Sequence, residues 1–226
     1  CRYWMKSLFC WKFPLRTISV PLKSCSYPIW IDNGLLKTLP ELLQPLNQGQ
    51  TWVIFSQKDI FLQHGHILDD ILRSRGFKTV YVPLPTGEDA KSFTAMEKAF
   101  SHILKAGCDR SSTFLALGGG VVGDVTGFIA ATFMRGVDYI QIPTTLLAMV
   151  DSSIGGKTGI NLSEGKNLAG VFWQPKAVVV DPEVLATLPV REFTSAMGEV
   201  IKYGAILNRK LFESVSNNMA DLIAGN

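Results

Sequence analysis

"TFLALGGGVVGD", residues 113–124, is the stretch that decides the fold, because an apolar strand runs through glycines directly into a helix. Within it, Gly118, Gly120 and Gly123 form a G-x-G-x-x-G pattern. Such glycines let backbone N–H groups approach a pyrophosphate at a helix N-terminus, where the helix dipole favours anions. The alternative is a tight strand-to-helix turn that needs glycine only for positive φ. The strand before the pattern and the helix after it favour a dinucleotide site.

Strands and helices alternate on both sides of this stretch. Short apolar runs predict strands over Tyr27–Ile31, Thr51–Phe55, Lys78–Val82, Thr113–Leu117, Asp138–Ile142 and Ala177–Val180. Helices are predicted over Asp59–Arg75, Ser92–Ala106 and Val122–Thr132. The alternation predicts an α/β fold built on a parallel, Rossmann-like sheet with helices on both faces.

The pattern changes after Pro189, where two further helices are predicted over Arg191–Leu207 and Lys210–Ala224. Two short helices cannot build a core of their own. We therefore expect three parts: a basic, disordered extension over residues 1–16, a dinucleotide-binding α/β domain over 17–188, and the incomplete beginning of an α-helical domain over 189–226.

Composition and charge exclude several classes of function. The chain has 226 residues, 47% of them hydrophobic, and a net charge of +3. The first 31 residues hold five basic residues and no acidic one, so the other 195 carry 17 basic and 19 acidic residues. That body offers no electrostatic footprint for nucleic acid. No apolar run approaches the ~18 residues that span a membrane, so we expect neither partner.

The cysteines and the N-terminus bear on location. The four cysteines (Cys1, Cys10, Cys25 and Cys108) form no C-x-x-C pair, which favours reduced thiols and a cytoplasmic location. The apolar stretch after Met5 is too short for a secretory signal, and a plastid transit peptide is the alternative use of the basic start. Because the chain begins with cysteine, residues 1–4 are expected to be non-native or read-through sequence.

A second glycine-rich stretch, "DSSIGGKTGIN" over residues 151–161, resembles the end of a nucleotide-binding P-loop. Asp151 stands where that motif has its first glycine, and no strand precedes it, so ATP binding is disfavoured. The segment "GGKTGINLSEGKN", residues 155–167, is predicted to be a hairpin or loop that carries Lys157 and Lys166, with Asp151 and Asn167 flanking them. Two ammonium groups there suit a phosphorylated or carboxylated substrate, and the alternative is a pair of solvated surface lysines.

Two acidic positions complete the candidate site. A dinucleotide site needs an acid for the ribose, and Glu88 follows a strand whereas Asp138 precedes one, at the wrong edge of the sheet. In "SAMGEVIKYG", Glu199 and Lys202 lie three apart on one helix face. They form either an ordinary surface ion pair or a metal-binding carboxylate beside a phosphate-binding lysine.

Several motifs in order carry a resemblance to a known family. The segments "GEDAK", "LGGGVVGDVTGFIAATFMRG", "IPTTLLAMVDSSIGGKTGIN", "GKNLAGVFWQP", "TLP" and "GEVIKYG" resemble those of the 3-dehydroquinate synthases, which are sugar-phosphate cyclases. The resemblance implies conversion of 3-deoxy-D-arabino-heptulosonate 7-phosphate to 3-dehydroquinate and phosphate by a homodimer, with catalytic NAD and a divalent metal, zinc or cobalt. Another cyclase, a polyol dehydrogenase of the same fold and a non-catalytic NAD-binding fragment are the alternatives.

The resemblance also implies roles for single residues. It assigns the NAD ribose to Glu88 and Lys91, the pyrophosphate region to Gly118, Gly119, Gly120, Gly123 and Asp124, and the lining of the cofactor cleft to Thr144, Thr145 and Thr187. It assigns contact with NAD and the reacting hydroxyl to Asp151, and places Lys166 between cofactor and substrate. It assigns substrate phosphate and hydroxyls to Lys157, Asn167 and Lys202, with Lys157 also near NAD, a phosphate contact across the dimer interface to Arg135, and the metal to Glu199.

The chain departs from the family's pattern in two places. "FSQKDI", residues 55–60, lacks the acid or amide that the family often places after this strand. The family's remaining metal ligands are histidines in a later helical segment, and we expect His64, His66 and His102 to be ordinary helix-surface residues. Because a catalytic zinc needs three protein ligands, this chain alone is expected to hold no catalytic zinc and to be inactive.

Overall fold

The computed structural model describes residues 15–22, 26–43 and 51–224, with only the backbone of residues 223 and 224. Residues 1–14 of the expected extension therefore lie outside the described residues. Arg16 was placed in that extension, but it begins a strand, β1. Of the four cysteines, Cys108 is described, and it is a buried free thiol.

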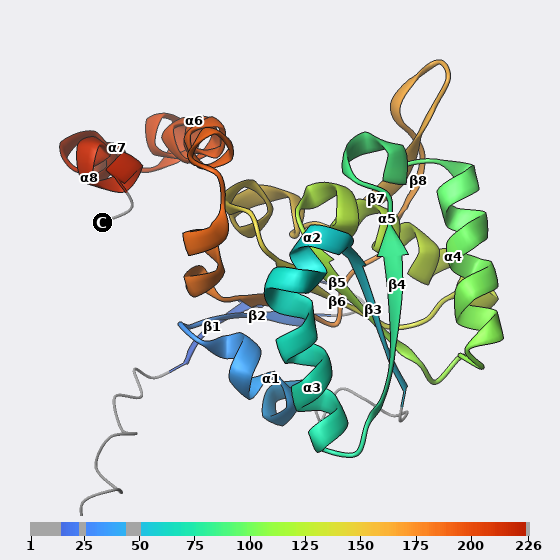
Figure 1. Ribbon diagram of the computed structural model, residues 1–226. Helices are drawn as coiled ribbons and strands as arrows, with labels where there is room; N and C mark the ends of the chain where they lie inside the picture. The colour runs from blue at the N-terminus through green and yellow to red at the C-terminus, as the bar shows by residue number, and fades with distance from the viewer. Residues whose placement is uncertain (1–14, 23–25, 44–50, 225–226) are drawn as a thin grey trace, which may run out of the picture.

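A seven-stranded sheet forms the centre of the molecule, with the strand order β1-β2-β9-β6-β5-β3-β4 (Figure 1). Its strands are β1 (Arg16–Val20), β2 (Tyr27–Ile31), β3 (Thr51–Gln57), β4 (Lys78–Leu84), β5 (Thr113–Gly118), β6 (Tyr139–Pro143) and β9 (Ala177–Val180). All neighbours pair in parallel except β1 and β2, which are antiparallel. The prediction of a parallel sheet is therefore confirmed, and corrected at one edge.

Helices cover both faces of this sheet, as predicted (Figure 1). One face carries α1 (Leu35–Leu43), α2 (Lys58–Ile60), the π-helical turn η2 (Phe61–Gly65) and α3 (His66–Ser74); the other carries α4 (Phe93–Lys105) and α5 (Gly120–Thr132). The sequence predicted one uninterrupted helix where α2, η2 and α3 lie. The strands are buried because both faces are covered; in β3, for example, Trp52 and Phe55 are fully inaccessible to solvent.

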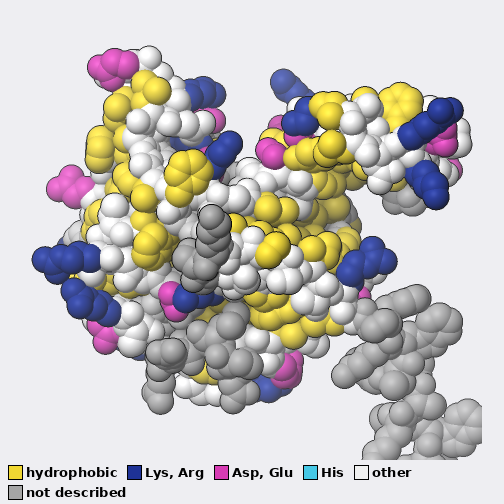
Figure 2. Space-filling view, turned by 180° about the vertical axis from the view of Figure 1, so that it is seen from behind, with side chains coloured by type: hydrophobic (Ala, Val, Ile, Leu, Met, Phe, Trp, Pro, Cys, Tyr) yellow, Lys and Arg dark blue, Asp and Glu magenta, His cyan; other side chains and the backbone are white. Residues whose placement is uncertain are grey.

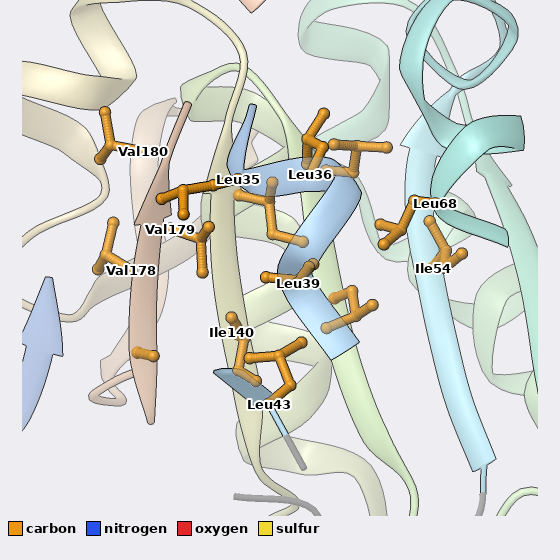
Figure 3. Packing of buried hydrophobic residues seen from close by; sticks show 14 of the residues in the cluster. Leu35, Leu36, Leu39, Leu43, Ile54, Leu68, Ile140, Val178, Val179 and Val180 are labelled. Atoms are coloured by element: carbon orange, nitrogen blue, oxygen red, sulfur yellow. The ribbon is translucent and has the colours of Figure 1, made fainter. Parts of the chain in front are cut away.

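Two apolar clusters hold the helices against the sheet. On the first face, Leu39 of α1 and Leu68 of α3 pack towards Ile54, Ile140 and Val179 of the strands (Figure 3). On the second face, side chains of α4 and α5 pack against the alternate strand residues, where the rings of Phe55 and Phe114 have centroids 5.0 Å apart. These clusters fix the sheet, so the carboxyl ends of its parallel strands lie along one edge.

A two-stranded antiparallel hairpin follows the sheet's β6. It consists of β7 (Lys157–Leu162) and β8 (Gly165–Phe172) and follows the π-helical turn η5 (Ala148–Ser152). The hairpin packs on α5, where Ile160 joins the second cluster. Because Asp151 lies in a helical turn and does not follow a strand, this segment is no P-loop, as predicted.

The remaining elements are short turns and a helical end. The turns are η3 (Gly87–Ala90), η4 (Phe133–Arg135) and η6 (Pro182–Thr187), and the helices are α6 (Val190–Leu207), α7 (Arg209–Asn217) and α8 (Met219–Ala224). The helices α6 to α8 lie to one side of the sheet domain (Figure 1). The second of the two predicted helices is in fact two, separated at Asn218. Within the described chain, no helix has the length and apolarity that crossing a membrane requires.

Candidate functional site

The glycine turn lies where β5 passes into α5. Gly118 ends the strand, Gly119 caps the helix and Gly120 begins it. None of these three residues adopts positive φ, so backbone conformation does not explain them. The lack of space for a side chain explains two of them. A Cβ on Gly120 would lie 2.8 Å from Ser152 Oγ, and one on Gly119 would lie 3.1 Å from Thr145 Cγ2. The turn is a place of close approach beside the N-terminus of α5.

Two buried hydroxyl groups border this turn. Thr144 donates its backbone N–H to Gly118 O at 3.0 Å, and Ser152 faces Gly120. Thr144 Oγ1 and Ser152 Oγ are both buried without a hydrogen-bond partner in the described part of the chain. Leaving a buried hydroxyl unpaired costs free energy. The donors and the helix N-terminus together fit a ligand that carries phosphate oxygens.

A cavity of about 470 Å³ lies next to the glycine turn, between α5, η5 and the hairpin. It is lined by Asp124, Asp151, Ser152, Ile154, Lys157, Thr158, Gly159, Asn167, Leu168, Gly170, Val171 and Phe172. The structure therefore brings together four residues expected in the site: Asp124, Asp151, Lys157 and Asn167. Lys157 is exposed, so its ammonium group is available to an anion.

Lys91 joins three elements of the site. Its side chain is only 6% exposed, and its Nζ lies 2.5 Å from Asp124 Oδ2 and 2.7 Å from Asn167 Oδ1. Burial raises the pKa of Asp124, and the hydrogen bond from Lys91 opposes that change. The ammonium group that was expected at a ribose is thus held by α5 and the hairpin.

Glu88 and Lys166 lie on the outer side of the group formed by Lys91, Asp124 and Asn167. Glu88 Oε2 accepts a hydrogen bond from Asn161 Nδ2 at 2.7 Å, and Glu88 Oε1 lies 3.4 Å from Lys166 Nζ. The hydrogen bond from Asn161 lowers the pKa of Glu88, and the nearby charge of Lys91 acts in the same direction. A ligand at this edge meets a carboxylate that is ionised at neutral pH.

Helix α6 reaches the cavity through Tyr203. Its hydroxyl group donates to Asp151 Oδ1 at 3.0 Å, and this bond is the main cause that raises the pKa of Tyr203 to about 12. One turn earlier, Glu199 accepts a hydrogen bond from Lys202, which lowers the pKa of Glu199. The pair thus has the geometry of an ordinary ion pair. Among the described residues, no three His, Cys, Asp or Glu side chains gather as metal ligands, so a metal site with Glu199 is not complete there.

The histidine prediction is wrong for His64. Its side chain is 9% exposed, and Nε2 lies 2.9 Å from Thr187 Oγ1. The wide π-helical turn η2 changes the helical register and directs His64 inwards, towards η6. His66 and His102 are exposed, as predicted. Thr187, expected in the cofactor cleft, is therefore tied to η2.

The structure does not bring Arg135 to the cavity. Arg135 is exposed, and it follows Met134 in a left-handed pair with φ of 70° and 48°. Its contact across a dimer interface stays a prediction. Asp138 pairs with Lys176 at 3.4 Å and directly precedes β6, so it lies at the amino end of that strand, as predicted.

Three residues of the site were missed in the sequence. Ser152 and Tyr203 stand beside residues that were named, and Asn161 ends the quoted "GGKTGIN" segment. Tyr203 could have been found, since it lies four residues after Glu199 and thus on the same helix face. The role of Asn161 depends on hairpin pairing, for which the sequence carries no local signal.

Solved structures first define the class of protein. A 2-epi-5-epi-valiolone synthase from Streptomyces hygroscopicus subsp. jinggangensis 5008, solved with NAD+ and Zn2+ bound, is 28% identical with a TM-score of 0.80, over 91% of this chain and 56% of that chain. A 2-deoxy-scyllo-inosose synthase, complexed with carbaglucose-6-phosphate, NAD+ and Co2+, shares the fold with a TM-score of 0.77 at 24% identity, over 83% of this chain and 50% of that chain. The fold is that of the sugar-phosphate cyclases.

The sequence comparisons then give the family. Residues 81–195 match the family model described as 3-dehydroquinate synthase N-terminal, and the chain belongs to the 3-dehydroquinate synthase family. The 3-dehydroquinate synthase of Prochlorococcus marinus subsp. pastoris is 48% identical over 202 residues, or 88% of this chain and 56% of that protein. That of Picosynechococcus sp. is 49% identical over 196 residues, or 87% and 54%. The chain thus spans just over half the length of these relatives.

Proposed function

We propose that the chain is the NAD+-binding part of a 3-dehydroquinate synthase, which converts 3-deoxy-D-arabino-heptulosonate 7-phosphate to 3-dehydroquinate and inorganic phosphate. One observation carries the proposal: the glycine turn at the start of α5 adjoins a cavity lined by Asp151, Lys157 and Asn167. A dinucleotide site and an anion-binding side chain thus share one space. The relatives at 48–49% identity support the same substrate.

The cofactor's place follows from the glycine turn. Backbone N–H groups of Gly119 and Gly120 hold the pyrophosphate, and the unpaired hydroxyls of Thr144 and Ser152 provide further hydrogen bonds. When bound, NAD+ supplies a reversible oxidation of an alcohol. Oxidation makes the neighbouring C–H bond more acidic, so phosphate can leave without a strong external base.

The chain's own residues hold the substrate. Lys157 and Asn167 bind the phosphate and hydroxyl groups, because both line the cavity. The Tyr203 hydroxyl group donates a hydrogen bond to Asp151 Oδ1 and so orients the Asp151 carboxylate. This carboxylate faces the hydroxyl groups of the substrate. Lys202 approaches from α6, where its ammonium group lies over the aromatic ring of Tyr203.

The metal, the oligomer and the location belong to the same proposal. Glu199 offers one carboxylate ligand to a zinc or cobalt ion, and the described residues gather no group of three such ligands. A homodimer, in which Arg135 reaches the partner's substrate, agrees with the exposure of Arg135. We propose a cytoplasmic location, or a plastid one if the basic start is a transit peptide.

A fusion tests the proposal. The chain is joined to the C-terminal half of the Picosynechococcus relative and assayed, with NAD+ and Zn2+, for phosphate and 3-dehydroquinate released from the heptulosonate phosphate. The fusion should form both products in equal amounts, while the 226-residue chain alone forms neither. A folded fusion that binds NAD+ but liberates no phosphate would contradict the proposal, and a different carbocycle would identify a sister cyclase.

Lys157→Ala in this fusion separates the two ligands. Losing a desolvated contact to the substrate phosphate should cost about 2–5 kcal/mol in substrate binding and change NAD+ affinity much less. Lys98→Ala, an exposed lysine on α4, is the matched control and should change neither. An equal loss for both ligands would make Lys157 chiefly an NAD+ contact.

A further inference from the structure

The β7–β8 hairpin has an irregular register at the site. Ile160 pairs with Ala169, but Leu162 pairs with Gly165. One residue of β7, Asn161, therefore opposes three residues of β8, which are Lys166, Asn167 and Leu168. Such bulges leave backbone groups unpaired and redirect side chains. Two residues of the proposed site, Lys166 and Asn167, lie in this bulge.

Asn161 provides a partner for one backbone group of the bulge. Its Oδ1 accepts the backbone N–H of Asn167 at 2.9 Å. Asn167 has φ of 57°, in the left-handed region that costs free energy for most residues other than glycine. The hydrogen bond thus holds Asn167 in a conformation that directs its side chain to Lys91, at 2.7 Å.

The same side chain also reaches the cofactor side of the site. Asn161 Nδ2 donates to Glu88 Oε2 at 2.7 Å, and its backbone N–H donates to Lys91 O at 3.0 Å. Three of its hydrogen-bonding groups, Nδ2, the backbone N–H and Oδ1, therefore contact Glu88, Lys91 and Asn167. These residues come from the segment after β4 and from β8, which are joined here by one amide side chain.

We propose that Asn161 is a positioning residue that holds the NAD+-ribose side and the substrate side of the site in a fixed relation. Asn161 is not one of the residues that line the cavity. It acts by fixing the Glu88 carboxylate and by stabilising the bulge that presents Lys166 and Asn167. The ligand classes rest on the function proposed above, whereas the positioning itself rests on the hydrogen bonds.

Amide exchange tests the positioning without any ligand. In Asn161→Ala, the Asn167 amide should exchange about tenfold faster or more, because it loses its acceptor, while amides of β3 and β5 stay protected. Asn33→Ala removes the same amide from an exposed turn and should leave the hairpin unchanged. Unchanged exchange at Asn167 in Asn161→Ala would overturn the inference.

NAD+ affinity, measured by calorimetry, then tests the effect on the site. Asn161→Ala should weaken NAD+ binding about tenfold, since a hydrogen bond to a charged group is lost. Combined with Glu88→Ala, it should cause little further loss, because both changes remove one interaction. The inference would be overturned if Asn161→Ala bound NAD+ with wild-type affinity although its hairpin amides exchanged faster. It would also be overturned if the losses of affinity in Asn161→Ala and Glu88→Ala were additive in the double variant.

The two proposals fail in different ways. If the wild-type chain binds no NAD+, the proposed cofactor is wrong, and the exchange rates still decide whether Asn161 holds the hairpin. If the wild type binds NAD+ and both Asn161→Ala readouts match the Asn33→Ala control, the role of Asn161 is wrong and the function stands.

Discussion

Lys91 shows how a charge is kept inside the site. Its side chain is 6% exposed, and that of Asp124 is 21% exposed. Burying an ion pair adds little net stability, because desolvation offsets the attraction, but removing one partner leaves an uncompensated charge. Lys91 therefore serves mainly to fix α5 and the hairpin at one distance, and with them the two sides of the cavity.

His64 gives the molecule a predictable dependence on pH. Burial lowers the pKa of His64 below its ordinary value of 6.5; the charge of Asp181 opposes this change, and His66 adds to it. The folded state thus prefers the neutral imidazole. Its contribution to stability is complete above about pH 6.5 and is lost as the pH falls through the lowered pKa.

The measurement compares urea midpoints at pH 7.5 and 5.5. His64→Gln keeps a polar partner for Thr187 but does not titrate, so the wild type should lose more stability than this variant on acidification. His102→Gln, at an exposed position, should behave as the wild type. Equal losses in the wild type and His64→Gln would show that His64 is not the titrating group.

At the scale of elements, the hairpin is held by glycines that let its strands approach. A Cβ on Gly170 would overlap Thr158 O of the facing strand, and a Cβ on Gly159 would lie 2.6 Å from Ala169 O. Gly170→Ala should therefore destabilise the chain by about 1–3 kcal/mol through overpacking. Urea unfolding measures this loss.

Gly198→Ala is the matched control for that change. Gly198 lies inside α6, and a Cβ there meets nothing within 4 Å. Alanine should therefore stabilise α6 by about 0.5–1 kcal/mol, because it restricts the unfolded chain. If Gly170→Ala and Gly198→Ala changed the free energy of unfolding in the same direction, this explanation of the hairpin would be wrong.

The elements that were predicted correctly are those with a strong local signal. β2 and β9 were predicted with their observed bounds, because each is a short apolar run between turns. β1 was missed because it is a short strand at the edge of the sheet, in which only Ile18 and Val20 are apolar and four of the five residues are exposed. α1 was missed because Pro40 stands inside its amphipathic pattern, and proline ordinarily interrupts a helix.

The candidate site divides in the same way. The glycine turn, Lys157 and Glu88 could be predicted, because strand ends and glycine patterns identify them locally. The position of His64 depends on a π-helical turn, and that of Asn161 on a change of register between two strands. Both arise from tertiary packing, which overrides the regular helix and hairpin that the residues alone predict.

At the scale of the whole molecule, the site is an assembly of distant segments. The segment after β4, the start of α5, the turn η5, the hairpin and α6 supply its residues, and the parallel sheet brings them to one edge. Exposed apolar side chains lie both in the site and beyond it: Phe172 of β8, which lines the cavity, is 72% exposed, and Ile206 and Leu207 of α6 are 69% and 77% exposed. Figure 2 shows apolar side chains among charged ones on the α6–α8 lobe.

We expect this edge of the sheet to bind NAD+ through the glycine turn, and titration calorimetry of the 226-residue chain with NAD+ measures that binding. One NAD+ should bind per chain. Binding should be lost in Gly120→Leu, whose side chain fills the space beside Ser152, and kept in Gly198→Ala, with circular dichroism showing that both variants fold. No binding to the wild type at millimolar NAD+, or equal binding to Gly120→Leu, would contradict the account.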